Sequence, residues 1–215
     1  MAKDASINQK MLNTWAIAII IWSVYRYYFK TDLPLWFDEF IAKPIVFLVP
    51  VYYFIIKYEN GKILQAIDFK FKKVNDWLFG IGAGIFVLVM GLIVNYVDTQ
   101  TIIPTITSTT LFLIVVAFAS SFTEEILSRG FVLKRLYAES NNVFSSVFFA
   151  SFLFFIMHVP ILFTNPQLHG SILLQVMATD FLLSFGVSLA YLQRKNVIVA
   201  IIIHAFYNLA IYLML

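Results

Sequence analysis

The chain has 215 residues, of which 61% are hydrophobic and only 13% are charged, whereas soluble globular chains carry about a quarter charged residues. This composition excludes a soluble globular domain, and the formal net charge of +3 is too small to indicate nucleic-acid binding. Because the chain has no cysteine, disulfides, cysteine-ligated zinc, iron–sulfur clusters and thiol nucleophiles are excluded as well.

Apolar segments recur along the chain, and each is long enough to cross a hydrocarbon core roughly 30 Å thick. They predict an all-α, polytopic helical bundle that forms a single membrane-embedded domain over residues 1–215, in a cell membrane and with the lipid bilayer as its solvent. Hydropathy predicts about seven membrane-spanning helices, within a range of six to eight, at residues 12–30, 36–57, 77–97, 108–138, 143–159, 172–193 and 197–215.

The first apolar run, from Trp15 to Tyr25, follows two lysines and superficially resembles a signal peptide. It lacks a small-residue cleavage site and leads into Tyr25-Arg26-Tyr27-Tyr28, an aromatic segment of the kind found at membrane interfaces. We therefore interpret it as a retained first span.

Three features between and within the later spans bear on the fold. Residues 57–76 form the one sizeable polar connection, because they contain five lysines among three acidic residues. Pro160 and Pro166 predict a loop or a re-entrant turn over residues 159–171. Gly80 and Gly84 are four residues apart in the third span, a small-residue spacing that favours close packing against another helix.

The basic residues are distributed asymmetrically along the chain. If the N-terminus is cytoplasmic and the spans alternate, the loops 98–107 and 159–171 hold no Lys or Arg. The inside segments then hold 12 of the 15 basic residues, namely Lys3, Lys10, Lys57, Lys62, Lys70, Lys72, Lys73, Arg129, Lys134, Arg135, Arg194 and Lys195. This distribution satisfies the positive-inside rule, so the sequence predicts a multi-pass protein with a cytoplasmic N-terminus.

Two adjacent carboxylates, Glu124 and Glu125, lie within an apolar helix. An ionised carboxylate at mid-membrane costs on the order of 2.5–3.5 kcal/mol, so two of them require partners or a function. Glu125 and Arg129 are four residues apart and can form an ion pair along the helix. Glu124 lies about 100° around the helix and is free of that pair. A structural alternative is the buried ion pair together with a neutral second glutamate.

Two of the three histidines, His158 and His204, lie within apolar helices, and His169 falls in a loop. A single histidine in a membrane helix more often joins two helices by a hydrogen bond than acts in catalysis. The surroundings add weight here, because Phe154 precedes His158 by one turn and can brace its ring. His204 shares a helical face with Asn208.

The expected depths of these residues in the bilayer overlap. At about 1.5 Å per residue from the predicted cytoplasmic ends, Glu124 lies roughly 15 Å deep, His158 about 24 Å and His204 about 12 Å. Three helices can therefore direct a carboxylate, two imidazoles and an amide to one place. Asp180, about 21 Å deep by the same count, is either a partner that orients His158 or a residue of helix packing.

Three motifs within residues 105–215 resemble those of a membrane protease family. The residues that carry them are Glu124-Glu125-x-x-x-Arg129, Phe154-x-x-x-His158 and His204-x-x-x-Asn208. They are similar to the EExxxR, FxxxH and HxxxN motifs of the CAAX-protease and bacteriocin-processing family, also called CPBP or Abi, which includes the type II CAAX prenyl endopeptidases. Each motif alone is weak, but here the three occur in order and each lies in an apolar helix.

The resemblance implies an intramembrane, glutamate-dependent endopeptidase that hydrolyses peptide bonds of membrane-associated peptide or protein substrates without a cofactor. It implies that Glu124 and His158 activate a water molecule, and that His204 and Asn208 stabilise the oxyanion. These residue types suit general-base catalysis and oxyanion stabilisation. The supporting residues are then Glu125, Arg129, Phe154 and Asp180.

Three other functions fit parts of the same pattern. Two histidines and a glutamate could ligate zinc in an intramembrane metalloprotease, although the sequence contains no H-E-x-x-H motif. A non-catalytic partner, such as a bacteriocin-immunity or regulatory scaffold, could keep the same helices. A transporter would show paired halves with interrupted spans, and the sequence has no such repeat. Beyond the bilayer and a peptide substrate, the sequence indicates no partner and no oligomeric state.

Overall fold

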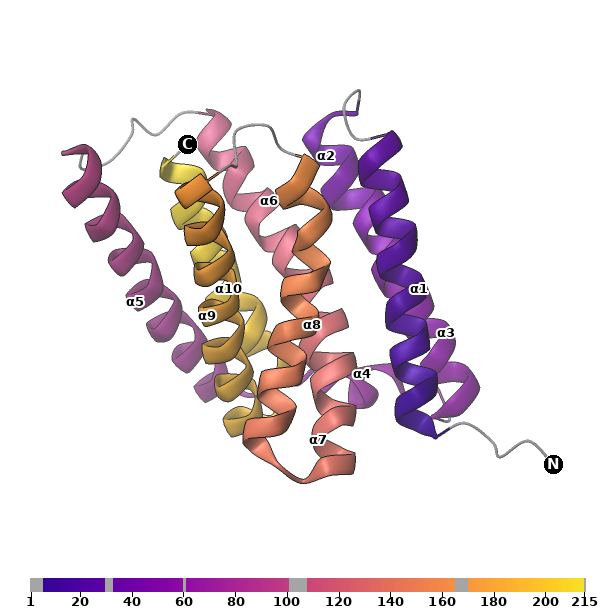
Figure 1. Ribbon diagram of the computed structural model, residues 1–215. Helices are drawn as coiled ribbons and strands as arrows, with labels where there is room; N and C mark the ends of the chain where they lie inside the picture. The colour runs from indigo at the N-terminus through magenta and orange to yellow at the C-terminus, as the bar shows by residue number, and fades with distance from the viewer. Residues whose placement is uncertain (1–5, 30–32, 60, 101–107, 165–169, 215) are drawn as a thin grey trace.

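In the computed structural model, which describes residues 6–29, 33–59, 61–100, 108–164 and 170–214, the chain is a bundle of long helices (Figure 1). Two of these long helices are continuous but contain π-helical segments, labelled η. In chain order the elements are α1 (Ile7–Tyr28); α2 (Leu35–Phe37), η2 (Asp38–Ala42), η3 (Pro44–Leu48) and α3 (Val49–Tyr58) in one helix; α4 (Ile63–Ala66); α5 (Val74–Thr99); α6 (Ser108–Glu125), η4 (Ile126–Leu133) and α7 (Lys134–Ser140) in one helix; α8 (Val143–Thr164); α9 (Gly170–Arg194); and α10 (Val197–Met214).

The helices have the length and apolarity of a membrane protein. Five segments qualify as candidate spans: Leu35–Tyr58, Val74–Val97, Ser108–Ser140, Val143–Pro160 and Leu173–Arg194. α10 adds a shorter apolar helix and α1 a further helix of 22 residues, and the described residues contain no strand. The predicted all-α, polytopic membrane bundle is confirmed.

The loop predicted over residues 159–171 is wrong on its N-terminal side. α8 continues through Pro160 and ends at Thr164. A proline removes one helical hydrogen bond, and membrane helices tolerate this loss because neighbouring groups satisfy the freed carbonyl. Pro166 and His169 lie outside the described residues.

The helix that carries the paired glutamates lies at the centre of the bundle. Every residue of η4 is buried. On one side, Phe131 packs in a hydrophobic cluster with Trp22 of α1 and Phe54 of α3. On the other side, Leu133 packs with Val147 of α8, Tyr191 of α9 and several residues of α10. The two hydrophobic clusters therefore meet on this helix, which fixes its position.

α5 packs closely against α10 along the predicted small-residue pair. A Cβ atom added at Gly80 would lie 3.2 Å from the Ile202 side chain, and one added at Gly84 would lie 2.5 Å from the Phe206 ring. Because only hydrogen fits at Gly84, the two backbones approach there as small residues allow. The expected role of this pair in helix packing is confirmed.

The polar connection between α3 and α5 folds against one end of the bundle. Asp68 accepts hydrogen bonds from Tyr191 at 2.8 Å and from Lys134 at 3.0 Å. Asn196, in the turn between α9 and α10, exchanges two hydrogen bonds with the backbone of Lys70, at 3.1 and 3.2 Å. This connection therefore ties together the ends of α7, α9 and α10.

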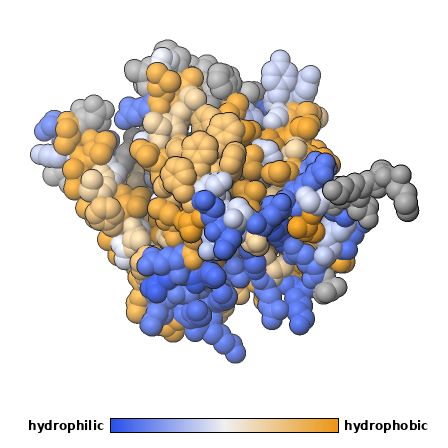
Figure 2. All heavy atoms as spheres, turned by 60° about the horizontal axis from the view of Figure 1, so that its bottom comes forward, coloured by the Kyte–Doolittle hydropathy of each residue, from blue (hydrophilic) through white to orange (hydrophobic). Residues whose placement is uncertain are grey.

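Polar residues gather at this end of the molecule (Figure 2). α1 begins at the same end as α4 and the turn between α7 and α8, whereas α10 runs to the opposite end (Figure 1). The first helix therefore starts at one end of the bundle and the last helix finishes at the other, as expected for a chain that crosses the membrane an odd number of times.

We expect the polar end to face the cytoplasm, because translocation of Lys and Arg is disfavoured. The chain has no native cysteine, so single cysteines can report this. Lys62→Cys should react with a membrane-impermeant maleimide only in permeabilised cells, whereas Gln100→Cys, at the other end, should react in intact cells. Both side chains are exposed. Labelling of Lys62→Cys in intact cells would show that the polar end faces the outside, opposite to the predicted orientation.

Candidate active site

Glu125 and Arg129 form the ion pair that their spacing predicts. Arg129 Nη1 lies 2.7 Å from Glu125 Oε1, and both side chains are only 1% exposed. The guanidinium also donates to the Ser184 carbonyl and hydroxyl oxygens of α9, at 2.9 and 2.8 Å, and lies 4.4 Å from the centre of the Phe154 ring. Each charge is therefore partnered inside the bundle, as a buried pair requires.

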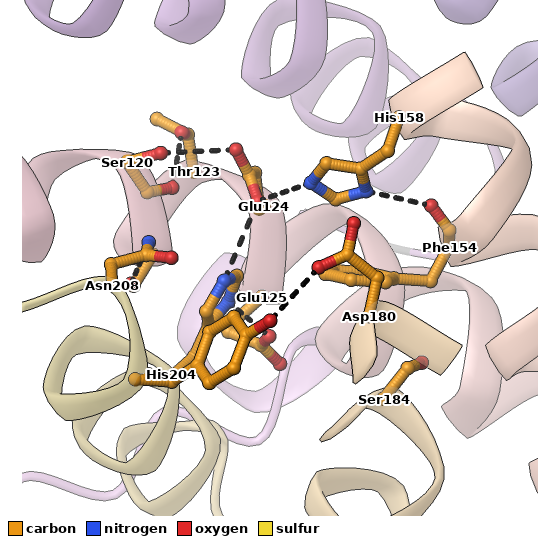
Figure 3. Close-up of polar contacts among 12 residues, drawn as sticks. Ser120, Thr123, Glu124, Glu125, Phe154, His158, Asp180, Ser184, His204 and Asn208 are labelled. Carbon is orange, nitrogen blue, oxygen red and sulfur yellow. Dashed lines mark hydrogen bonds and ion pairs between the residues drawn. The ribbon is translucent and has the colours of Figure 1, made fainter. Parts of the chain in front are cut away.

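Glu124, the other member of the pair of glutamates, is 4% exposed and lies against different groups. Its Oε1 accepts hydrogen bonds from Lys43 at 2.7 Å and from the Ser120 hydroxyl at 3.0 Å. Its Oε2 faces two ring nitrogens, Nε2 of His158 at 3.5 Å and Nε2 of His204 at 3.8 Å (Figure 3). One carboxylate oxygen is thus held by fixed partners, and the other is directed at the two histidines.

His158 is oriented by the residue one turn earlier in α8. Its Nδ1 lies 3.0 Å from the Phe154 carbonyl oxygen, and the two ring centres are 4.6 Å apart. The Phe154 ring also lies 5.5 Å from the His204 ring. The predicted bracing contact between Phe154 and His158 is present, and Phe154 packs between both histidines and the Arg129 guanidinium.

His204 and Asn208 lie on one face of α10, as their spacing predicts, and each contacts the helix that carries the glutamates. His204 Nδ1 donates to Glu125 Oε1 at 2.8 Å, so Glu125 binds both His204 and Arg129. Asn208 Nδ2 donates to the Ser121 hydroxyl at 3.1 Å. All four predicted catalytic side chains therefore face the interior around the end of α6.

The comparison with known families agrees with this geometry. Residues 106–210, which contain all three motifs, match the family model described as type II CAAX prenyl endopeptidase Rce1-like. This part of the chain is similar to the Rce1-like family. No curated protein and no solved structure gives a significant match to the chain. The Rce1-like family is a family of membrane proteases, so the match indicates proteolysis of the CAAX-protease type.

Asp180, within the Rce1-like region, pairs with a tyrosine of α10. The Tyr207 hydroxyl donates to Asp180 Oδ1 at 3.2 Å, and the Tyr207 ring lies 6.4 Å from the His204 ring. The contact joins α9 to α10 beside the histidines. A role of Asp180 in orienting His158 stays a prediction.

Two charged residues outside the Rce1-like region complete the surroundings of Glu124, and the sequence interpretation did not single them out. Lys43 Nζ lies 2.7 Å from Glu124 Oε1 and 2.7 Å from Glu39 Oε2. Both residues belong to the helix that runs from α2 to α3. The sequence did contain an indication of this pair. A Glu and a Lys four residues apart in an apolar span require an explanation as much as Glu125 and Arg129 do.

The metal alternative can be compared with the same geometry. Among the residues that the structure describes, no group of three or more His, Cys, Asp or Glu side chains is arranged to hold a metal ion. Glu124 Oε1 is already bonded to an ammonium group, which occupies one side of the carboxylate. Metal independence of the Rce1-like region stays a prediction.

Proposed function

We propose that the chain is a glutamate-dependent intramembrane endopeptidase in which Glu124 and His158 activate the water that attacks a peptide bond. The observation that carries this proposal is that Glu124 Oε2 faces Nε2 of His158 at 3.5 Å and Nε2 of His204 at 3.8 Å. Both distances are longer than an ordinary direct hydrogen bond. A water that bonds to Oε2 and to a ring nitrogen holds the two about 4–5 Å apart, so we expect the side chains to separate slightly when the water binds. The protease family of this region supports the same reaction class.

His158 has the orientation of a proton acceptor in this proposal. Its Nδ1–H donates to the Phe154 carbonyl, so Nε2 of the neutral ring is an acceptor. A water between Nε2 and Glu124 Oε2 donates to both and keeps a lone pair for the substrate carbonyl. As the new C–O bond forms, Glu124 takes one proton and later delivers it to the leaving nitrogen, acting first as general base and then as general acid.

His204 and Asn208 would stabilise the oxyanion. Asn208 uses one Nδ2 hydrogen on Ser121, and its second hydrogen can bind the substrate oxygen. His204 donates from Nδ1 to Glu125, in the way that a carboxylate orients a catalytic imidazole. As an imidazolium the ring also donates from Nε2. Loss of one such donor typically lowers kcat by about 10²–10³.

The substrates would be peptides or proteins in the membrane or at its surface. Prenylated C-terminal peptides, peptide pheromone or bacteriocin precursors and membrane-protein partners all fit this chemistry. The His158 side chain is 21% exposed, against 5% for Glu124 and 3% for His204. A substrate would therefore approach the carboxylate from the His158 side.

A direct test compares protein termini in cells that express the native chain with those in cells that express His158→Asn. We expect a set of new termini that appears only with the native chain, because the variant lacks the imidazole acceptor. His169→Asn, a histidine outside the three motifs, is the matched control and should produce the native set. Identical sets of termini for native and His158→Asn cells would contradict the proposal.

Cleavage should survive a strong zinc chelator, because Glu124 and His158 hold the water without a metal. The measurement is product formation by the purified chain in lipid vesicles, before and after chelation, with the peptide whose cleavage the termini reveal. Loss of product on chelation and its recovery on adding zinc would instead assign His158 and His204 as zinc ligands.

A further inference from the structure

Lys43 is a buried cation at a membrane-spanning position. It lies between the π-helical segments η2 and η3 and is 7% exposed. A lysine within a membrane span is costly, so such residues pair with other groups and commonly mark functional sites. π-Helical turns are also frequent at functional sites. The first half of the chain, which the family model does not match, therefore contains a residue that requires an explanation.

The ammonium group of Lys43 makes three hydrogen bonds, which is the number of its hydrogens. It donates to Glu39 Oε2, to the Ser120 hydroxyl and to Glu124 Oε1, each at 2.7 Å. Ser120 in turn donates to the same Glu124 oxygen at 3.0 Å. Glu124 Oε1 thus has two donors, and its position follows from theirs.

Resting on the proposed role of Glu124 as the base, we propose that Lys43 is a positioning residue of the catalytic centre. It holds Glu124 Oε1, so that Oε2 is directed at His158 and His204, and it keeps the carboxylate ionised within the bilayer. Glu39, four residues before Lys43, holds the ammonium in place. The site is therefore incomplete without the first half of the chain.

The surroundings of this network come from six helices. Glu39 and Lys43 belong to the α2–α3 helix and Ser120 and Glu124 to α6, and His158 and His204 face Glu124 from α8 and α10. The Trp22 ring of α1 lies 6.0 Å from Lys43 Nζ. Arg26 interacts electrostatically with Glu39, and Tyr212 with Glu39, Lys43 and Glu124. Arg129 of η4 and Asp180 of α9 interact electrostatically with Glu124. Among the described residues, Lys43 is the lysine or arginine that forms a direct ion pair with Glu124.

Reaction with dicyclohexylcarbodiimide tests this without a substrate, since the apolar reagent modifies protonated carboxyl groups in membranes. Glu124 of the native chain in lipid vesicles should be nearly unreactive at neutral pH. An opposite charge this close changes the protonation equilibrium of a carboxyl group by roughly ten- to a thousandfold. In Lys43→Gln we therefore expect at least a tenfold faster modification, localised by mass spectrometry and absent from Lys43→Gln/Glu124→Gln.

Lys57→Gln is the matched control, because Lys57 lies on the same helix, is exposed, and interacts with the exposed Tyr53 and Tyr58 rings and with the Tyr53 hydroxyl at 3.0 Å. It should label as the native chain does. Lys43→Arg keeps the charge and should restore protection. If Lys43→Gln does not fold, Lys43→Gln/Glu39→Gln removes a cation and an anion together and should show the same faster labelling. Labelling of the folded variant at the native rate would overturn the proposal.

Cleavage separates this inference from the proposed function. Lys43→Gln should lower kcat with little change in KM, and its cleavage should recover partly at higher pH, where Glu124 ionises again. If Lys43 only stabilised the fold, its loss would neither lower kcat at constant KM nor allow cleavage to recover at higher pH. If Glu124→Gln still cleaves while Lys43→Gln labels faster, the proposed function fails and the contact between Lys43 and Glu124 stands.

Discussion

Glu124→Gln should abolish cleavage while the protein still folds. Gln keeps a carbonyl oxygen that can accept from Lys43 and Ser120, as Glu124 Oε1 does now. It replaces the oxygen that faces the histidines with an amide group, which cannot take a proton from water. General-base catalysis contributes about 10²–10⁴ in rate, so we expect cleavage to fall by at least that factor. Termini in cells and thermal unfolding of the purified protein measure the two effects.

Glu59→Gln is the matched control for this substitution. Glu59 pairs with Arg135 at 2.5 Å at the polar end of the bundle, away from the histidines, so its loss should leave cleavage unchanged. Cleavage by Glu124→Gln at the native rate would remove Glu124 from the mechanism. Full biological function of a Glu124→Gln protein that cleaves nothing would support the non-catalytic scaffold instead.

Glu125→Gln should unfold far more readily than the native chain. It removes the charge that Arg129 pairs with, at a site where both side chains are 1% exposed. Removing one member of a buried pair typically costs about 3–5 kcal/mol, because the other charge is left uncompensated. Denaturant unfolding in detergent measures the change. We also expect some loss of cleavage in the folded fraction, because Glu125 accepts the hydrogen bond from His204 Nδ1.

The double variant Glu125→Gln/Arg129→Gln isolates the charge effect, since it removes both members of the pair. It should be more stable than Glu125→Gln alone, because no uncompensated charge is left. A double variant that is less stable than either single variant would mean that the two residues stabilise the fold independently.

Spacing along one helix predicted much of this site. The Glu125–Arg129 pair, the Phe154–His158 contact and the shared face of His204 and Asn208 all follow from helical geometry. The membrane class followed from composition, and the packing of Gly84 followed from its spacing from Gly80. Each of these predictions depends on residues that are close in the sequence.

Contacts between distant helices could not be predicted in the same way. Glu124 and Lys43 are 81 residues apart, and no spacing rule connects them. The hydrogen bond between His204 and Glu125, 79 residues apart, likewise depends on which helix faces which. Pro160 misled the interpretation because the helix breaking that proline causes in water is weaker in a membrane bundle.

The close approach of Gly84 to Phe206 also bears on the order of synthesis. α5 ends at Thr99, whereas its partner α10 begins at Val197. At roughly 5–20 residues per second, the roughly one hundred intervening residues take about 5–20 s to make. During that time α5 has to reside in lipid without the helix it packs against. Two properties of α5 make it stable in lipid before α10 is present. Its mean hydropathy of 2.5 is the highest of the five candidate spans, and only 11% of its most apolar stretch is buried against the rest of the protein.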